Sequence, residues 1–433
     1  MALTGSAVGL GNMWRYPYLM GTNGGAAFIL IYIVSIILVS LPIMLSEMII
    51  GRRGASNPAG SLSRLSSGSK LWHILGFLMV IAPFLIMTYY GVVGGWTVDY
   101  LIKSLTASFV GMDSEAACSA MFEETMSSPI RPLIFMLVFV LLSGAVISAG
   151  VQKGIERYSK ILMPLLLVVM VILAIYSCTL PGASAGLEFM FRPDFTKVTG
   201  STVLAAFGQS FFSLSLGAGT VLTYSSYMKN SEDISKMGNM TAISDTCFAL
   251  IAGMAIFPAV FAFGFSPSEG PGLLFVVIPA IFSKMTGGIF LSIAFFFSLF
   301  IAAITSFISL MEVVAVCLSE ELKISRKRAV SIVMTLIVIL GILCSLSCGP
   351  LQNVKLFGKT IFDVMDFAAS NILMTLGGLV VVLFIGWKMK KEDFYDEISS
   401  SGKYRHNYYP LIYFLVKYFS PIIIITIMIF GLI

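Results

Sequence analysis

Charged residues are scarce in this chain of 433 residues, because Asp, Glu, Lys and Arg together make up only 11% of it. A soluble domain carries roughly 25% charged residues, so the chain lacks the polar surface that a soluble protein of this length needs. Hydrophobic residues instead reach 58%. This composition excludes a soluble globular protein, and the lack of long basic runs argues against a nucleic-acid partner.

Histidine is rarer still, with only His73 and His406, far apart in the chain. The six cysteines are scattered and form no zinc-binding pattern with histidine. We interpret them as isolated packing residues, with a Cys344–Cys348 disulfide as the alternative. The start of the chain has neither the basic region nor the small-residue cleavage site of a signal peptide. A membrane-embedded enzyme would need metal ligands or a nucleophile beside a base, and the sequence offers no such set.

What the sequence does contain is a series of long apolar runs. A helix needs about 20 apolar residues to cross the hydrocarbon core. Because lipid offers no hydrogen-bond partners, the backbone N–H and C=O groups of such a run must bond to each other, as they do in a helix. We therefore predict an all-α polytopic membrane protein with eleven spanning segments. Their predicted spans are 1–21, 26–50, 72–108, 130–149, 158–178, 200–228, 238–265, 288–318, 329–348, 360–387 and 409–432.

The basic residues between these segments predict the orientation of the chain. Alternate loops hold 18 of the 27 Lys and Arg residues, at 51–71, 150–160, 229–237, 319–328 and 388–407. The loop at 109–129, by contrast, is acidic. Since basic loops stay in the cytoplasm, we expect a cytoplasmic N-terminus and an extracytoplasmic C-terminus in the cell (plasma or inner) membrane.

Two segments are interrupted in the same manner. Paired glycines with hydroxyl or amide residues occur at 5–12 in the first segment and at 213–219 in the sixth. Each glycine weakens a helix by about 1 kcal/mol relative to alanine, so these stretches favour unwinding. Five segments separate the two breaks, which predicts one domain of two inverted repeats, at 1–178 and 200–387, with an extra helix at 409–432. The alternative is close helix packing through small residues.

Two such breaks at matching positions point to a binding site at the repeat interface. Carbonyls freed by unwinding, together with Asn, Ser and Thr oxygens, suit a hard cation such as sodium. The free N–H groups of the half-helix that follows suit a carboxylate. One site can therefore hold a cation and an amino-acid carboxylate together.

The sequence around these breaks resembles a known family. The stretch GSAVGLGNMWRYPYLMGTNGGAAF at 5–28 is similar to the first helix of the neurotransmitter:sodium symporter family, which has the leucine-transporter fold. The resemblance continues through 154–166, 209–227, 302–313 and 320–330 and covers essentially the whole chain. It points to the branch of bacterial amino-acid carriers, in which members with eleven helices occur.

The resemblance implies two sodium sites and no organic cofactor. The first would consist of the Ala7 carbonyl, Asn12, Ser213, Asp245 and the substrate carboxylate. The second would consist of the carbonyls of Gly5, Val8 and Ala302 and the hydroxyls of Thr305 and Ser306. The two adjacent hydroxyls could instead bond back to carbonyls of their own helix.

The resemblance also implies where an amino acid would bind. Its carboxylate would meet the amides of Leu10 and Gly11 and the Tyr90 hydroxyl. Its amine would meet the carbonyls of Ala7, Phe212 and Ser213 and the Ser215 hydroxyl. Its side chain would lie among Ile86, Phe212, Ala218 and Leu310, with Ser306 nearby.

Two departures from better-known members narrow the expected substrate. Gly9 stands where monoamine carriers have an aspartate, which favours a substrate that brings its own carboxylate. Ala218 stands where the leucine carrier has a large aromatic residue, so we expect a bulky apolar or aromatic amino acid.

Asp245 is an ionisable residue inside a spanning segment, which is costly and usually functional. Chloride-dependent relatives have asparagine there and a serine one turn later, where this chain has Ala249. We therefore expect transport that requires sodium but not chloride. The alternative is that Asp245 forms an ion pair with a neighbouring helix.

Charged residues that match the family also predict two gates. Arg15 and Asp366, with Gln209 close by, would close the outer side. Tyr227 and Glu320 would close the cytoplasmic side, although the basic residue that the family has upstream of the first helix is absent. The expected function is sodium-coupled symport by alternating access, and a non-transporting amino-acid sensor on the same fold is the alternative.

Overall fold

The computed structural model describes residues 9–112, 114–148, 152–267 and 273–432. In the first half of the chain the helices are η1 (Gly11–Arg15), α2 (Tyr16–Thr22), α3 (Ala26–Ser35), η2 (Ile36–Ser40), α4 (Leu41–Gly54), α5 (Pro58–Leu65), α6 (Lys70–Leu105), α7 (Glu115–Ser127), α8 (Arg131–Ser148), α9 (Gln152–Thr179), α10 (Ala183–Phe191) and η3 (Phe195–Lys197). In the second half they are α11 (Gly200–Ser213), α12 (Thr220–Ser225), α13 (Ile234–Phe263), α14 (Leu273–Lys284), α15 (Gly288–Leu322), α16 (Arg326–Ser347), α17 (Ile361–Phe367), η5 (Ala368–Leu373), α18 (Met374–Leu383), η6 (Phe384–Lys388), α19 (Lys391–Ile398), α20 (Tyr409–Phe414), η7 (Leu415–Phe419) and α21 (Ser420–Leu432).

The predicted all-α membrane fold is confirmed, and the described residues form no β-strand. Seven of the described helices are long and apolar enough to cross a membrane, and two further spans are helices sharply bent against a neighbour. The two remaining predicted segments, the first and the sixth, are those with predicted breaks. The division into two inverted repeats and their bounds stays a prediction.

Several helices extend beyond the predicted apolar segments. α9 begins at Gln152 rather than at 158, α13 begins at Ile234 rather than at 238, and α15 continues to Leu322 rather than ending at 318. The added turns carry charged and polar residues. Hydropathy marks where a helix lies in hydrocarbon, whereas the helix itself ends only where its backbone finds a cap.

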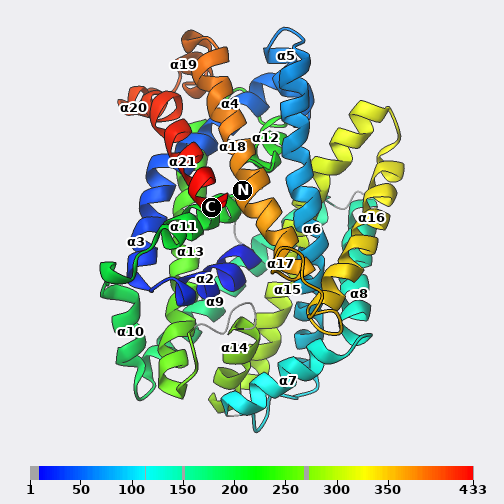
Figure 1. Ribbon diagram of the computed structural model, residues 1–433, viewed down its shortest axis with the longest axis vertical. Helices are drawn as coiled ribbons and strands as arrows, with labels where there is room; N and C mark the ends of the chain where they lie inside the picture. The colour runs from blue at the N-terminus through cyan, green and yellow to red at the C-terminus, as the bar shows by residue number, and fades with distance from the viewer. Residues whose placement is uncertain (1–8, 113, 149–151, 268–272, 433) are drawn as a thin grey trace.

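The long helices run roughly along the vertical axis in Figure 1, and shorter helices lie at the two ends. α7, α10 and α14 lie at one end, and α5 and α19 lie at the other. The loops that contain α5 and α19 are two of the basic ones. α6 and α15 pack against each other, and α12 packs against α4 and α15, which brings the sixth segment beside the second and the eighth.

The sixth segment is broken where the glycines predict it. α11 and α12 are separated by residues 214–219. Ser215 and Gly217 have φ values of 54° and 70°, a region that glycine tolerates best. A Cβ at residue 217 would lie 1.8 Å from the carbonyl oxygen of Met374, so only glycine fits there. The freed amide of Gly217 donates to Glu47 Oε1 at 2.6 Å, which satisfies it inside the protein.

Only the end of the first predicted break can be described. Gly5, Ala7 and Val8 lie outside the described residues. Helical structure begins at Leu10 and continues into the π-helical turn η1. Just before it, the Gly9 amide donates to Asn12 Oδ1 at 3.2 Å. The helical stretch that begins at Leu10 is referred to as the first half-helix, and the amide just before it bonds to a side chain.

Candidate substrate and ion site

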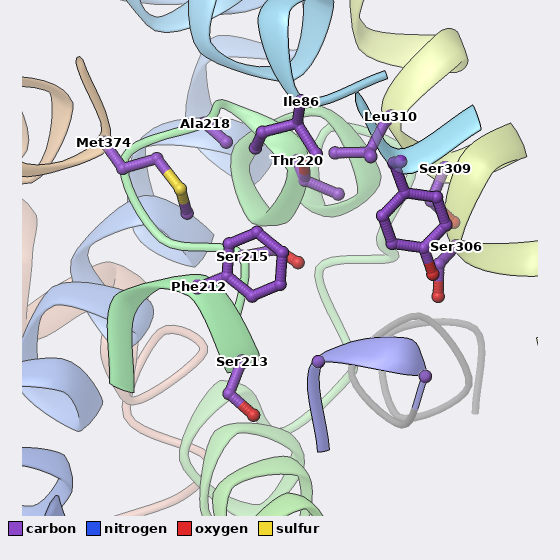
Figure 2. A pocket seen from close by; sticks show the side chains of 13 residues that line it. Ile86, Phe212, Ser213, Ser215, Ala218, Thr220, Ser306, Ser309, Leu310 and Met374 are labelled. Carbon is purple, nitrogen blue, oxygen red and sulfur yellow. The ribbon is translucent and has the colours of Figure 1, made fainter. Parts of the chain in front are cut away.

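A cavity lies at the break between α11 and α12, enclosed by the start of the first half-helix, α6, α15 and α18 (Figure 2). Its volume is about 30 Å³, which is room for about one or two water molecules, so the wall residues enclose it tightly. Its wall consists of Gly9, Gly11, Ile86, Tyr90, Phe212, Ser213, Ser215, Ala218, Thr220, Ser306, Ser309, Leu310 and Met374.

The cavity brings together ten of the residues predicted to contact substrate: Gly9, Gly11, Ile86, Tyr90, Phe212, Ser213, Ser215, Ala218, Ser306 and Leu310. The side chain of Leu10 is fully buried in the core and does not line the cavity. Ala7 lies outside the described residues.

Three wall residues were not predicted: Thr220, Ser309 and Met374. Ser309 lies one helical turn from Thr305, a spacing that would have indicated it. Met374 comes from α18 and has no local signal in the sequence.

The two ends of the cavity differ in chemistry. Figure 2 shows the start of the first half-helix and Ser213 at one end, and Ile86, Ala218 and Leu310 at the other. Backbone amides, carbonyls and a hydroxyl therefore face the first end, whereas alkyl side chains form most of the second. Such a cavity matches a small molecule with a polar head and an apolar tail.

Gly9 allows close approach at the polar end. A Cβ at residue 9 would lie 2.5 Å from Ser306 Oγ and 3.6 Å from the Tyr90 hydroxyl, so no side chain fits there without displacing Ser306. The buried Tyr90 hydroxyl lies near the Ser306 hydroxyl and the Leu10 amide. Neither bonds to it with normal geometry, and it has no other hydrogen-bond partner among the described residues. It is therefore available to a ligand carboxylate.

Asp245 on α13 is at the centre of a buried network beside this polar end. Its carboxylate accepts hydrogen bonds from Asn12 Nδ2 at 2.7 Å, from Ser213 Oγ at 2.8 Å and from the Tyr32 hydroxyl at 3.1 Å. All four residues are at most 3% exposed. These donors are neutral, and no ion pair to Asp245 is present among the described residues. Among the described residues, Asp245 therefore forms no ion pair with a neighbouring helix, which was the alternative interpretation.

This network fits a hard monovalent cation. A fully buried carboxylate without a counter-charge is costly, and a cation held by it and by the Ser213 oxygen would offset that cost. Asn12 contacts both the carboxylate and the hydroxyl, because its Nδ2 lies 2.7 Å from Asp245 Oδ1 and 3.1 Å from Ser213 Oγ. Oxygen donors without His or Cys select an alkali or alkaline-earth cation over a transition metal.

Only one side of the second predicted sodium site can be described. Ala302, Thr305 and Ser306 lie on α15, and Gly5 and Val8, the other predicted ligands, lie outside the described residues. Thr305 Oγ1 donates to the Ala302 carbonyl at 2.9 Å, as the alternative interpretation of adjacent hydroxyls expects. The second sodium site stays a prediction.

Arg15 covers the side of the cavity that is predicted to face outward. It is 4% exposed, and its Nη2 lies 3.4 Å from Asp366 Oδ2 on α17. Its Nη1 donates to Gln209 Oε1 at 2.9 Å, and Gln209 in turn donates to the Gly11 carbonyl at 3.0 Å. The guanidinium carbon lies 4.7 Å from the centre of the Phe212 ring, which is part of the cavity wall. The predicted outer pair is thus formed and lies directly above the cavity.

Glu320, which was predicted to close the cytoplasmic side together with Tyr227, contacts the connection between α4 and α5. Glu320 accepts hydrogen bonds from Ser56 Oγ at 2.8 Å and from Asn57 Nδ2 at 2.7 Å, in the connection between α4 and α5. Tyr227 is 61% exposed, and no hydrogen bond joins the two side chains among the described residues.

A second acidic residue on α15, Glu312, also closes this side. It is 3% exposed, and Arg326 Nη2 at the start of α16 lies 2.6 Å from its Oε2. One turn earlier on α15, Ser309 accepts a hydrogen bond from the Tyr224 hydroxyl at 3.0 Å. These contacts tie α12, α15 and α16 together below the cavity.

Comparison with known proteins identifies the chain. The model of the sodium:neurotransmitter symporter family matches residues 1–126 and 122–433. This chain belongs to that family. Its members are transporters rather than enzymes, and the chain is a sodium-coupled transporter of the membrane.

Relatives and a solved structure agree with this assignment. An uncharacterised sodium-dependent transporter of Bacillus subtilis (strain 168), YhdH, is 38% identical over 427 residues, 99% of this chain and 94% of the relative. A sodium-dependent transporter of Haemophilus influenzae is 36% identical and covers 100% of this chain and 96% of the relative. The crystal structure of MhsT in complex with L-phenylalanine superposes with a TM-score of 0.94 at 42% identity, covering 99% of this chain and 97% of MhsT.

Proposed function

We propose that this chain carries amino acids with bulky apolar or aromatic side chains into the cell together with sodium, and that it needs no chloride. The observation that carries the proposal is the two-ended cavity. Unpartnered Tyr90 and the first half-helix form the polar end, and Ile86, Ala218 and Leu310 form most of the apolar end. The structural relative MhsT binds L-phenylalanine, which has this same polar head and apolar tail.

The polar end accounts for the coupling to sodium. The substrate carboxylate would bind near Tyr90 and the amides of Leu10 and Gly11, beside the Asn12–Ser213–Asp245 network. A cation held by that network attracts the carboxylate, so each ligand strengthens the binding of the other. No covalent step is needed, because the sodium gradient supplies the free energy.

Asp245 supports chloride independence. Its buried carboxylate already places one negative charge beside the proposed cation, and no described basic residue pairs with it. A bound chloride would add a second negative charge next to the first, and like charges at this distance repel strongly in a buried site. Uptake should therefore be the same in chloride and in gluconate medium.

Contacts between side chains close the cavity on both sides, which supports transport by alternating access. Arg15 and Asp366 close the outer side, and Glu312 with Arg326 and Glu320 with Asn57 close the other. Opening the cavity to one side would break the contacts on that side while the contacts on the other side persist. The basic loops support an orientation with the Glu320 side in the cytoplasm, the N-terminus inside and the C-terminus outside.

Uptake by proteoliposomes tests this function. Purified protein is reconstituted, a sodium gradient is imposed, and entry of labelled phenylalanine is followed in chloride and in gluconate. We expect sodium-dependent uptake that is equal in both media and that unlabelled tyrosine or tryptophan inhibits more than alanine or glycine. A strict chloride requirement would reject chloride independence, and better inhibition by alanine would reject the substrate class. Sodium-dependent binding without uptake would favour a sensor.

A further inference from the structure

Thr220 is the one residue in the apolar part of the cavity wall that carries a hydroxyl without a partner. It is the first residue of α12, it is 1% exposed, and its Oγ1 has no hydrogen-bond partner among the described residues. Figure 2 shows it beside Ile86 and Leu310, at the end of the cavity away from Ser213. A buried hydroxyl without a partner costs roughly 1–3 kcal/mol, so its presence calls for an explanation.

Local structure does not require this hydroxyl. The N-cap of α12 is Gly219, and no side chain caps that helix end. The side chain of Thr220 therefore does not serve as a cap, although threonine at a helix start often does. A valine would fill the same volume without the unsatisfied polar atom.

The neighbouring Ser309 is already engaged. It accepts a hydrogen bond from the Tyr224 hydroxyl at 3.0 Å and donates its own hydrogen to the Thr305 carbonyl at 2.9 Å. Its hydroxyl hydrogen is thus committed within the protein. Thr220, by contrast, retains its donor and both lone pairs for a ligand.

The cavity wall near Thr220 contains small and adaptable side chains, which suit the far end of a substrate side chain. Ala218, two residues earlier, contributes only a methyl group, and Met374 on the adjoining wall has an unbranched side chain that adapts to irregular shapes. A substrate whose carboxylate lies at the Gly9–Gly11 end would direct its side chain toward this region.

We propose that Thr220 is a specificity residue that selects aromatic amino acids with a hydrogen-bond donor at the far end of the side chain. The phenol of tyrosine or the indole N–H of tryptophan would donate to Thr220 Oγ1, and phenylalanine would leave it unsatisfied. The inference rests on the proposed function, because it deepens the substrate class of the same cavity. A net neutral hydrogen bond corresponds to a preference for tyrosine over phenylalanine of roughly 3- to 10-fold.

The test compares sodium-dependent binding of tyrosine and phenylalanine to the purified full chain, by isothermal titration calorimetry. We expect the unmodified protein to bind tyrosine roughly 3- to 10-fold more tightly. Thr220→Val should reduce this ratio to about one or below, mainly by weakening tyrosine, and Thr220→Ser should retain the preference because it retains the hydroxyl.

Thr223→Val is the matched control. Thr223 lies one turn later on the same helix, is fully buried, and also has no hydrogen-bond partner among the described residues, but it does not line the cavity. This variant should leave the tyrosine-to-phenylalanine ratio unchanged.

Three outcomes overturn the inference: tighter binding of phenylalanine by the unmodified protein, an unchanged ratio in Thr220→Val, or an equal change in Thr223→Val. The first needs no variant, so the inference stays testable even where a variant fails to fold. If the unmodified protein binds no amino acid in the presence of sodium, the proposed function itself fails.

Discussion

Replacing Asp245 by asparagine removes one buried negative charge while retaining the size and shape of the side chain. The carboxylate lies 2.8 Å from Ser213 Oγ, so a cation bound to that oxygen would lie within about 4 Å of the carboxylate. At an effective dielectric constant of about 20, two unit charges at that distance attract by about 4 kcal/mol. Hydrogen bonds that do not depend on sodium also stabilise the free carboxylate, so we expect only about 2–3 kcal/mol of this attraction to be lost. That loss corresponds to a decrease of roughly 30- to 150-fold in sodium affinity.

The assay is a sodium titration of phenylalanine binding in chloride-free buffer, for the unmodified protein and for Asp245→Asn. The matched control is Asp363→Asn, the same chemical change at an exposed position on α17, which should leave the sodium titration unchanged. A sodium affinity of Asp245→Asn within about threefold of the unmodified protein would refute the electrostatic reasoning. Adding Ala249→Ser to Asp245→Asn tests the same idea in reverse, because the pair should then bind sodium better when chloride is present.

Three other substitutions probe the cavity, the break and the outer layer. Ala218→Phe should fill the apolar end and weaken phenylalanine binding at least 10-fold, while alanine binding is retained or gained; equal loss of both ligands would contradict this. Gly217→Ala should destabilise the protein by several kcal/mol, seen as a lower thermal midpoint in detergent, because its Cβ would collide with a carbonyl oxygen at 1.8 Å. Gly111→Ala is its control, since that glycine also has a positive φ but no atom within 4 Å of an added Cβ. An equal loss of stability in both variants would mean that the positive φ, and not the collision, causes the loss. Arg15→Gln should leave Asp366 without its partner and reduce uptake more than 10-fold, with sodium-dependent binding less affected; unchanged uptake would show that this pair does not seal the outer side.

The amino-acid sequence by itself determined the membrane fold and the break in the sixth segment. Both follow from local chemistry: apolar runs must form helices in lipid, and glycines at 217 and 219 lower the cost of leaving the helix. The family motifs also brought Asn12, Ser213 and Asp245 to one predicted site, and the structure places them in one hydrogen-bond network.

Other features were decided only by tertiary packing. Met374 reaches the cavity from α18, and Glu320 contacts Asn57 in the connection between α4 and α5. Thr220 is informative only because its surroundings leave its hydroxyl unpaired. These contacts join residues far apart in the chain, and their partners depend on how helices cross. Periodicity and composition describe one helix at a time, so they predict which residues are buried but not which side chains meet.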